Sequence, residues 1–335
     1  MSAFTRPASW RALIPLTVLA VTAAACGSDS NSTSSPADTA GADAPAEAPA
    51  ETPTETPTEA ATLRIGAIPD QEPERLQRTY GLIADFLEAE LADVSPGIDV
   101  EYVPVTEYEG AVTGFAIGDL DLVWFGGLTG VQARLEVEGA QAIAQRDIDE
   151  AFTSVFVASP DSGIEPIADV AGLSVLADRS FTFGSETSTS GRLMPQSFLS
   201  EAGVTLDDFR GQPGFSGSHD ATIEVVAAGT FEAGALNSQV WDDRVAEGVV
   251  DADKVVEVFR TPPYFDYHWV GQPDLDERFG DGFSADLLAA FESLDASDPA
   301  DAEILDLFGA GAFIATENSN YDAIEAVGRD AGLIR

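Results

Sequence analysis

The sequence predicts an α/β fold of two doubly wound lobes joined by a two-strand hinge. Strand and helix patterns alternate along most of the chain, which is typical of sheets with helices on both faces. Some strand segments are continuously apolar, as in Leu122-Val123-Trp124-Phe125, which indicates parallel strands buried on both faces. The folded part, residues 63–335, also has about the length at which one hydrophobic core divides into two.

The first lobe is expected to alternate three strands with two helices, at 63–68, 75–92, 98–105, 107–117 and 121–125. The first helix is predicted from apolar residues at helical spacing, among them Leu76 and Ile83. Thr106 has the residue type of an N-cap, so it is expected to start the second helix. The strand at 121–125 stops at Gly126-Gly127.

The rest of the chain predicts further strand–helix pairs and a return to the first lobe. Strands are expected at 173–176, 214–215 and 233–236, and C-terminal helices at about 285–294, 302–308 and 321–331. Two strands, 153–158 and 255–259, have the pattern of crossings between lobes. Lobe 1 would then be 63–156 plus 258–335 and lobe 2 would be 157–257. A chain that leaves and returns makes a hinge that allows closure around a ligand.

The N-terminal segment has the pattern of an export signal. Residues 1–25 place two arginines before an apolar stretch that is too short and too rich in alanine for a membrane span. The sequence Ala23-Ala24-Ala25-Cys26-Gly27 resembles a bacterial lipobox, so Cys26 is expected to be lipidated and to anchor the chain outside the cytoplasm. Ordinary cleavage beside an incidental Cys26 is the alternative. Residues 26–62 are expected to form an acidic, disordered Pro/Thr-rich tether.

Composition excludes several classes of protein. Lys and Arg total 16 against 58 Asp and Glu, a net charge of -42, which excludes a general nucleic-acid binder because such binding needs a cationic face. A single cysteine leaves no intrachain disulfide, and two histidines, His219 and His268, argue against a Cys/His zinc site. We therefore expect no metal and no cofactor, and a monomer.

A hydroxyl-rich turn between a strand and a helix is the clearest local signal for function. It reads Ser185-Glu186-Thr187-Ser188-Thr189-Ser190-Gly191-Arg192-Leu193-Met194-Pro195. Such a turn offers free backbone N–H groups, hydroxyls and the positive end of a helix dipole, which together bind an oxyanion without lysine or arginine. A plain N-cap turn with surplus serines is the simpler alternative.

Three other segments carry candidate ligand-binding residues. His219, at a second strand–helix junction, fits an anion donor or an ordinary helix start. Trp124, Phe125 and Gly126 end a strand at the sheet edge where α/β folds bind ligands, although a core aromatic pair fits as well. The run from 262 to 269, which contains Asp266, fits a cleft lining or a packed loop.

Together with Tyr108 and the strand through Asn237, these segments resemble the phosphate/phosphite/phosphonate-binding proteins of ABC importers, most of all the branch named for selenate binding. The resemblance covers nearly all of residues 63–335 and implies a type 2 periplasmic-binding-protein fold without enzymatic activity. It implies a tetrahedral oxyanion, held in the inter-lobe cleft and delivered to an ABC permease with its ATPase. It also implies that the anion is surrounded by Tyr108, Ser188, Thr189, Ser190, His219 and Asp266. The other segments complete the expected site with Trp124, Phe125, Gly126, Asn237 and Tyr264.

The chemistry of Asp266 bears on which anion is bound: phosphonate, phosphite, phosphate, selenate or sulfate. Selenate and sulfate are fully deprotonated at neutral pH and only accept hydrogen bonds, so a carboxylate would repel them. Phosphorus oxyanions keep a proton that a carboxylate can accept. An Asp266 that faces the ligand favours them, whereas one turned away, or held by His268, leaves selenate open. Asn237, where the family often has an acid, shifts the balance toward a site of donors only.

Two alternatives come from other classes of protein. A serine hydrolase would use Ser190, His219 and either Asp220 or Asp266, but the chain has no Gly-x-Ser-x-Gly motif. A cation-binding surface lipoprotein would suit the acidity, but there is no EF-hand loop and no clustered histidine.

Overall fold

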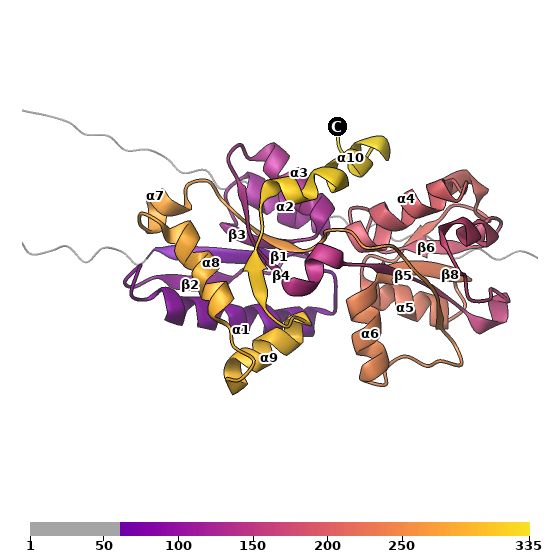
Figure 1. Cartoon of the computed structure of the whole chain (residues 1–335), viewed down its shortest axis with the longest axis horizontal. Helices are drawn as coiled ribbons and strands as arrows, with labels where there is room; N and C mark the ends of the chain where they lie inside the picture. The colour runs from indigo at the N-terminus through magenta and orange to yellow at the C-terminus, as the bar shows by residue number, and fades with distance from the viewer. Residues whose placement is uncertain (1–60) are drawn as a thin grey trace, which may run out of the picture. The chain divides into compact units, whose positions relative to one another are not determined.

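The computed structural model describes residues 61–335, which contain two mixed β-sheets flanked by helices (Figure 1). The predicted signal peptide, Cys26 and almost all of the predicted tether lie outside the described residues. No helix in the described part of the chain is both long and apolar enough to cross a membrane. The two sheets confirm the predicted α/β architecture.

The first sheet has the strand order β11-β4-β10-β3-β1-β2. Strand β1 is parallel to both of its neighbours, β2 and β3, whereas β10 and β11 run antiparallel to theirs. Its strands are β1 (Thr62–Ala67), β2 (Asp99–Tyr102), β3 (Leu122–Phe125), β4 (Gln141–Arg146), β10 (His268–Gly271) and β11 (Phe313–Ala315).

Helices from both ends of the chain cover this sheet, as the sequence predicts. In Figure 1 the yellow C-terminal helices lie beside the indigo N-terminal elements, and α1 contacts both α8 and α9. The helices are α1 (Pro73–Leu91), α2 (Tyr108–Ala116), α3 (Gly127–Glu136), α7 (Leu275–Phe279), α8 (Phe283–Ser293), α9 (Pro299–Phe308) and α10 (Asp322–Asp330).

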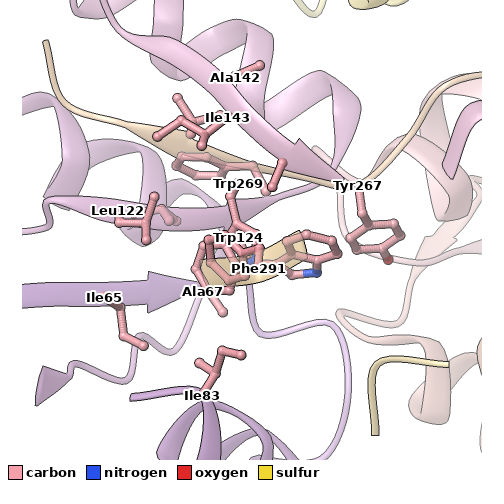
Figure 2. Close-up of a cluster of buried hydrophobic side chains, with 14 of the residues drawn as sticks. Ile65, Ala67, Ile83, Leu122, Trp124, Ala142, Ile143, Tyr267, Trp269 and Phe291 are labelled. Atoms are coloured by element: carbon pink, nitrogen blue, oxygen red, sulfur yellow. The ribbon is translucent and has the colours of Figure 1, made fainter. Parts of the chain in front are cut away.

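The core of this lobe is built around the two tryptophans of β3 and β10. Trp269 stacks on Phe291 of α8 with ring centroids 5.2 Å apart, and Trp124 lies 5.4 Å from Trp269 (Figure 2). Burial of such rings supplies most of the hydrophobic stabilisation of a core. Tyr267 lies at the margin of the cluster, where it stacks on Trp124. The core therefore fixes one side of this tyrosine and leaves its hydroxyl for other contacts.

The second sheet has the order β7-β6-β8-β5-β9. Strand β6 is parallel to β7 and β8, and β5 is antiparallel to β8 and β9. Its elements are β5 (Ser154–Ala158), β6 (Phe181–Phe183), α4 (Met194–Glu201), β7 (Gly214–Phe215), α5 (His219–Ala227), β8 (Ala233–Asn237), α6 (Ser238–Ala246) and β9 (Val256–Arg260).

Two local predictions are wrong. The segment predicted as a strand at 173–176 belongs to a 3-10 helix, η3 (Val170–Leu176), because the Asp169 carboxylate caps it by accepting from the Gly172 N–H at 3.0 Å. The second helix starts after Glu107 rather than at Thr106, and it has no side-chain cap. Short apolar runs do not distinguish a strand from one turn of helix, which explains the first error.

The connections between the sheets lie just outside the two predicted crossing strands. Both β5 and β9 pair entirely within the second sheet, so the chain changes sheets in segments 147–153 and 261–267. There Phe152 and Tyr264 form a single antiparallel bridge with two backbone hydrogen bonds of 2.9 Å. The two-strand connection agrees with a hinge, and the lobe boundaries stay a prediction.

Candidate functional site

Helix starts from both lobes follow the carboxyl ends of strands β3, β6 and β8. Ser188 caps a short π-helical turn, η4 (Thr189–Leu193), by accepting from the Gly191 N–H at 3.0 Å. Asn237 caps α6 in the same way, and its Oδ1 accepts from the Val240 N–H at 3.0 Å. Both side chains thus serve as N-caps, which for Ser188 is one of the two alternatives that the sequence left open.

The lobes touch at the start of α3. The Thr189 hydroxyl accepts a hydrogen bond from the Leu128 N–H, and Oδ1 of Asp266 accepts one from the Gly127 N–H, each at 2.9 Å. A Cβ on Gly126 would lie 3.0 Å from the Thr189 Oγ1 and 3.3 Å from the Asp266 Oδ1. Glycine at this position therefore allows the hydroxyl-rich turn to approach the helix start closely.

Three polar atoms near this contact are buried without a hydrogen-bond partner among the described residues. They are the Tyr108 hydroxyl, the Ser190 hydroxyl and Oδ2 of Asp266. Ser190 directly follows Thr189 in the turn. Tyr108 lies near Ser188 and near the carboxylates of Asp70 and Asp266: burial and then the charge of Asp70 raise its pKa well above the ordinary value, although the Ser188 hydroxyl lowers it in part. Leaving such atoms unpaired costs about 1–3 kcal/mol each, so the arrangement calls for a bound partner.

His219 belongs to a second, fully bonded group of side chains around the Tyr267 hydroxyl. That hydroxyl donates to Oδ2 of Asp70 at 2.9 Å and accepts from the Asn237 amide at 3.0 Å. Nδ1 of His219 accepts from the Asn237 backbone N–H, so its Nε2 carries the proton and donates to the tyrosine at 3.2 Å. Burial lowers the pKa of His219 to about 4, which keeps the imidazole neutral.

This group adjoins the hydroxyl-rich turn. A Cβ on Gly191 would lie 3.3 Å from Cε1 of His219. A cavity of about 20 Å³, which is room for about one water molecule, lies between Asp70, Trp124, Asn237 and other side chains. The cavity borders the group around Tyr267, and its lining does not include Tyr108, Ser190 or Asp266.

Two buried carboxyl groups give the site its proton chemistry. Burial raises the pKa of Asp266 to about 7, although the Gly127 N–H lowers it in part. Burial likewise raises the pKa of Asp70 to about 6, against the hydrogen bond from Tyr267. Near neutral pH Asp266 is therefore close to half-protonated and Asp70 is mostly ionised, so Asp266 is the group better placed to exchange a proton with a ligand.

A buried arginine supports the site from behind. Arg146 forms a two-point ion pair with Asp149 at 2.7 and 2.8 Å and donates to the Phe308 carbonyl at 2.6 Å. Its guanidinium also lies 4.9 Å above the Tyr267 ring, and the backbone N–H of Tyr267 donates to Oδ1 of Asp149 at 3.2 Å. Because protein groups occupy its donors, Arg146 positions Tyr267 rather than offering charge to a ligand.

The structure separates the predicted site residues into two sets. Phe125 is not brought to the site, since it packs edge-on against Phe115 in the core at 5.8 Å. Trp124, its neighbour in β3, points the other way and stacks on Tyr267, as alternation along a strand requires. Tyr264 lies behind the turn, where its hydroxyl contacts the Ser154 Oγ at 2.6 Å. The remaining predicted residues line or adjoin the buried contact described above.

Sequence reasoning missed Asp70, Arg146, Asp149 and Tyr267. Asp70 follows the first strand at the same sheet edge as Gly126, so the rule that selected Gly126 could have found it. Tyr267 stood in the aromatic run, but nothing in the sequence distinguished its hydroxyl from that of Tyr264. The ion pair behind it has no sequence signal beyond its three-residue spacing.

The contacts of Asp266 exclude one of the arrangements that the sequence left open, a carboxylate held by His268. Nδ1 of His268 lies 3.0 Å from the backbone carbonyl of Asp266, and its Nε2 lies 2.6 Å from Nη1 of Arg134. The imidazole therefore does not hold the carboxylate, which faces the start of α3 instead.

The hydrolase arrangement is not formed. Asp220 pairs with Arg244 at 2.6 Å, and both nitrogens of His219 bond to groups other than Ser190. Within residues 61–335, no group of three or more His, Cys, Asp or Glu side chains is placed to hold a metal ion.

Comparison with known proteins agrees with this geometry. The family described as ABC transporter, phosphonate, periplasmic substrate-binding protein matches residues 65–321. A probable ABC transporter phosphite binding protein, PhnD1 of Prochlorococcus marinus, is 47% identical over 274 residues, which cover 82% of this chain and 91% of the relative.

Solved structures show the same two-lobed fold. The structure of PhnD1 from Prochlorococcus marinus in complex with methylphosphonate superposes with a TM-score of 0.78, covering 82% of this chain and 99% of that chain. The periplasmic aliphatic sulphonate binding protein SsuA of Escherichia coli, 15% identical, superposes with a TM-score of 0.56 over 82% of this chain and 88% of that chain, a likeness of fold alone.

Proposed function

The chain belongs to the periplasmic substrate-binding proteins of ABC phosphonate transporters, and on that premise we propose that it captures a phosphorus oxyanion that carries one proton. As a member of this family it is the binding component of a phosphonate/phosphite importer, acts outside the cytoplasm and is not an enzyme. Methylphosphonate and phosphite are the ligands that we expect to bind.

The observation that carries the proposal is the chemistry of the three unpaired atoms. Two of them, on Tyr108 and Ser190, are hydroxyl groups that can donate, and the third is a carboxylate oxygen of Asp266. An anion that accepts from the hydroxyls and shares one proton with the carboxylate satisfies all three at once. Sulfate and selenate bring no proton, so they would bind only when Asp266 is itself protonated.

The relatives support the class of ligand. One is named for phosphite, and its solved structure contains methylphosphonate. The helix starts add to the attraction, because their free N–H groups and dipoles favour negative charge. Arg146 is occupied by Asp149, so it adds little charge of its own to this attraction.

Calorimetric titration tests the proposal directly. We would titrate the protein with methylphosphonate, phosphite, phosphate, sulfate and selenate at about pH 7, and repeat the series with Asp266→Asn. The wild type should prefer the phosphorus anions, and the amide variant should lose that preference because it cannot accept a proton. Equal affinity of the wild type for sulfate and methylphosphonate would overturn the proposal. The predicted likeness to the selenate branch is tested by the same series.

We further propose that Cys26 carries the lipid that anchors the protein and that the loaded protein delivers its ligand to a permease with an ATPase. The lipobox-like sequence before Cys26 supports the anchor. Metabolic labelling with palmitate should mark the wild type and not Cys26→Ser. Absence of label from both proteins, with both exported, would refute the anchor.

A further inference from the structure

At one edge of their contact, the two lobes are joined by a hydrogen bond and by ion pairs. At the start of α1, the Glu72 N–H donates to Oδ2 of Asp220 at 3.1 Å. One turn later, Arg75 pairs with Asp243 of α6 at 3.4 Å and with Glu247, the C-cap residue of α6, at 3.0 Å. Helix α1 packs on β1 and β2, whereas α6 packs on β5 and β8. These contacts therefore join the two lobes.

Acidic side chains of the second lobe at this margin also pair with an arginine of their own lobe. Arg244 pairs with Asp220 at 2.6 Å and with Glu247 at 3.0 Å, all within that lobe. Among the ion pairs of residues 61–335, those of Arg75 are the ones that join the lobes. The Arg75 side chain is 19% exposed, whereas those of Asp243 and Glu247 are 29% and 43% exposed, so solvent screens these pairs in part.

Arg75 is one of few cations among several acidic side chains at this edge of the lobe contact. A cavity of about 240 Å³ beside it is lined by two arginines and by Glu72, Asp220, Glu224 and Glu247. Without Arg75, the acids of the second lobe would face Glu72 of the first lobe with one cation fewer between them. Like charges that come together on closure repel, so the loss would favour separation of the lobes.

We propose that Arg75 is a positioning residue that stabilises the closed arrangement of the lobes and so sets how long the ligand stays bound, without touching the ligand. The proposal rests on the proposed function for its ligand. A contact made only in the closed state stabilises that state alone and shifts the population toward it. Its loss should act mainly on the rate of ligand release.

The same helix offers a matched control. Arg78, one turn further along α1, pairs with Glu303 of α9 at 2.6 Å. Both partners of this pair lie in the first lobe, so it persists whether the lobes are open or closed. Arg78→Gln removes the same charge from the same helix as Arg75→Gln, but it breaks no contact between the lobes.

The first experiment measures ligand release. Dissociation of methylphosphonate is followed by stopped flow for the wild type, Arg75→Gln, Arg75→Lys and Arg78→Gln. We expect release about three- to tenfold faster in Arg75→Gln, partial recovery in Arg75→Lys, and less than about twofold change in Arg78→Gln. Equal release rates for Arg75→Gln and Arg78→Gln would overturn the proposal.

The second experiment needs no ligand. Spin labels are placed on the full chain with Cys26→Ser, through Glu90→Cys on α1 and Glu201→Cys on α4, both exposed positions. The distance distribution between the labels should shift to longer values with Arg75→Gln and not with Arg78→Gln. If the wild type binds none of the anions, the proposed function fails, and this measurement still decides the role of Arg75. Unchanged distances in both variants would refute that role.

Discussion

Replacing Asp266 by asparagine should stabilise the ligand-free protein while weakening ligand binding. The carboxyl is completely buried, and its pKa is raised from 3.8 to about 7, chiefly by burial. A raised carboxyl pKa means that ionisation opposes folding. The resulting loss in the free energy of unfolding is absent below about pH 4, grows as the pH rises, and reaches its full size above about pH 7. At about 1.36 kcal/mol per pH unit, it reaches about 4 kcal/mol.

The amide removes this penalty but adds a smaller one. Its oxygen can still accept from the Gly127 N–H, whereas its NH₂ group takes the place of an oxygen that has no partner among the described residues. An unpaired buried donor costs about 1–3 kcal/mol, so we expect a net gain of about 1–3 kcal/mol at about pH 8. For a domain of this size that raises Tm by about 3–10 °C.

Thermal unfolding at two pH values measures the effect. At about pH 5 the wild-type penalty falls to about 2 kcal/mol, so the advantage of Asp266→Asn should nearly vanish. The exposed Asp85→Asn serves as a control for the change from acid to amide and should show no such pH dependence. An Asp266→Asn variant that is less stable than the wild type at about pH 8 would refute the reasoning.

Other substitutions separate binding from stability. Ser190→Ala should weaken methylphosphonate binding by about 1–2 kcal/mol in calorimetry yet raise the Tm of the ligand-free protein, because it removes a buried hydroxyl that has no partner among the described residues; a lower Tm would contradict this. Tyr267→Phe should lower the free energy of unfolding by about 1–3 kcal/mol in urea titration, since it removes the hydroxyl to which Asp70 is bonded; an unchanged midpoint would contradict this. Gly130→Ala should cost at least about 2 kcal/mol, because a Cβ there overlaps the buried imidazole of His268, and near-wild-type stability would show that the ring moves freely.

Local sequence patterns were sufficient for several strands and helices and for the hydroxyl-rich turn, but they missed β4, β6, β10 and β11. Apolar residues at helical spacing predicted α1, and a continuous apolar run predicted β3. Both predictions succeed because each pattern involves residues that are close together in the chain. The segment at 173–176 failed since a side-chain cap from Asp169 favours a helical turn there over a strand. The cap lies four residues outside the apolar run from which the strand was predicted.

By itself, the sequence determined the α/β class, the family and the turn that carries Ser190, because these depend on short-range order and on motif content. Only the tertiary structure placed Asp70 and Tyr267 beside His219, across 149 and 48 residues of chain respectively. It also decided that Asp266 faces a helix start and that Phe125 faces the core. Side-chain direction and burial arise when distant segments pack, and burial is what moves a carboxyl pKa toward neutrality.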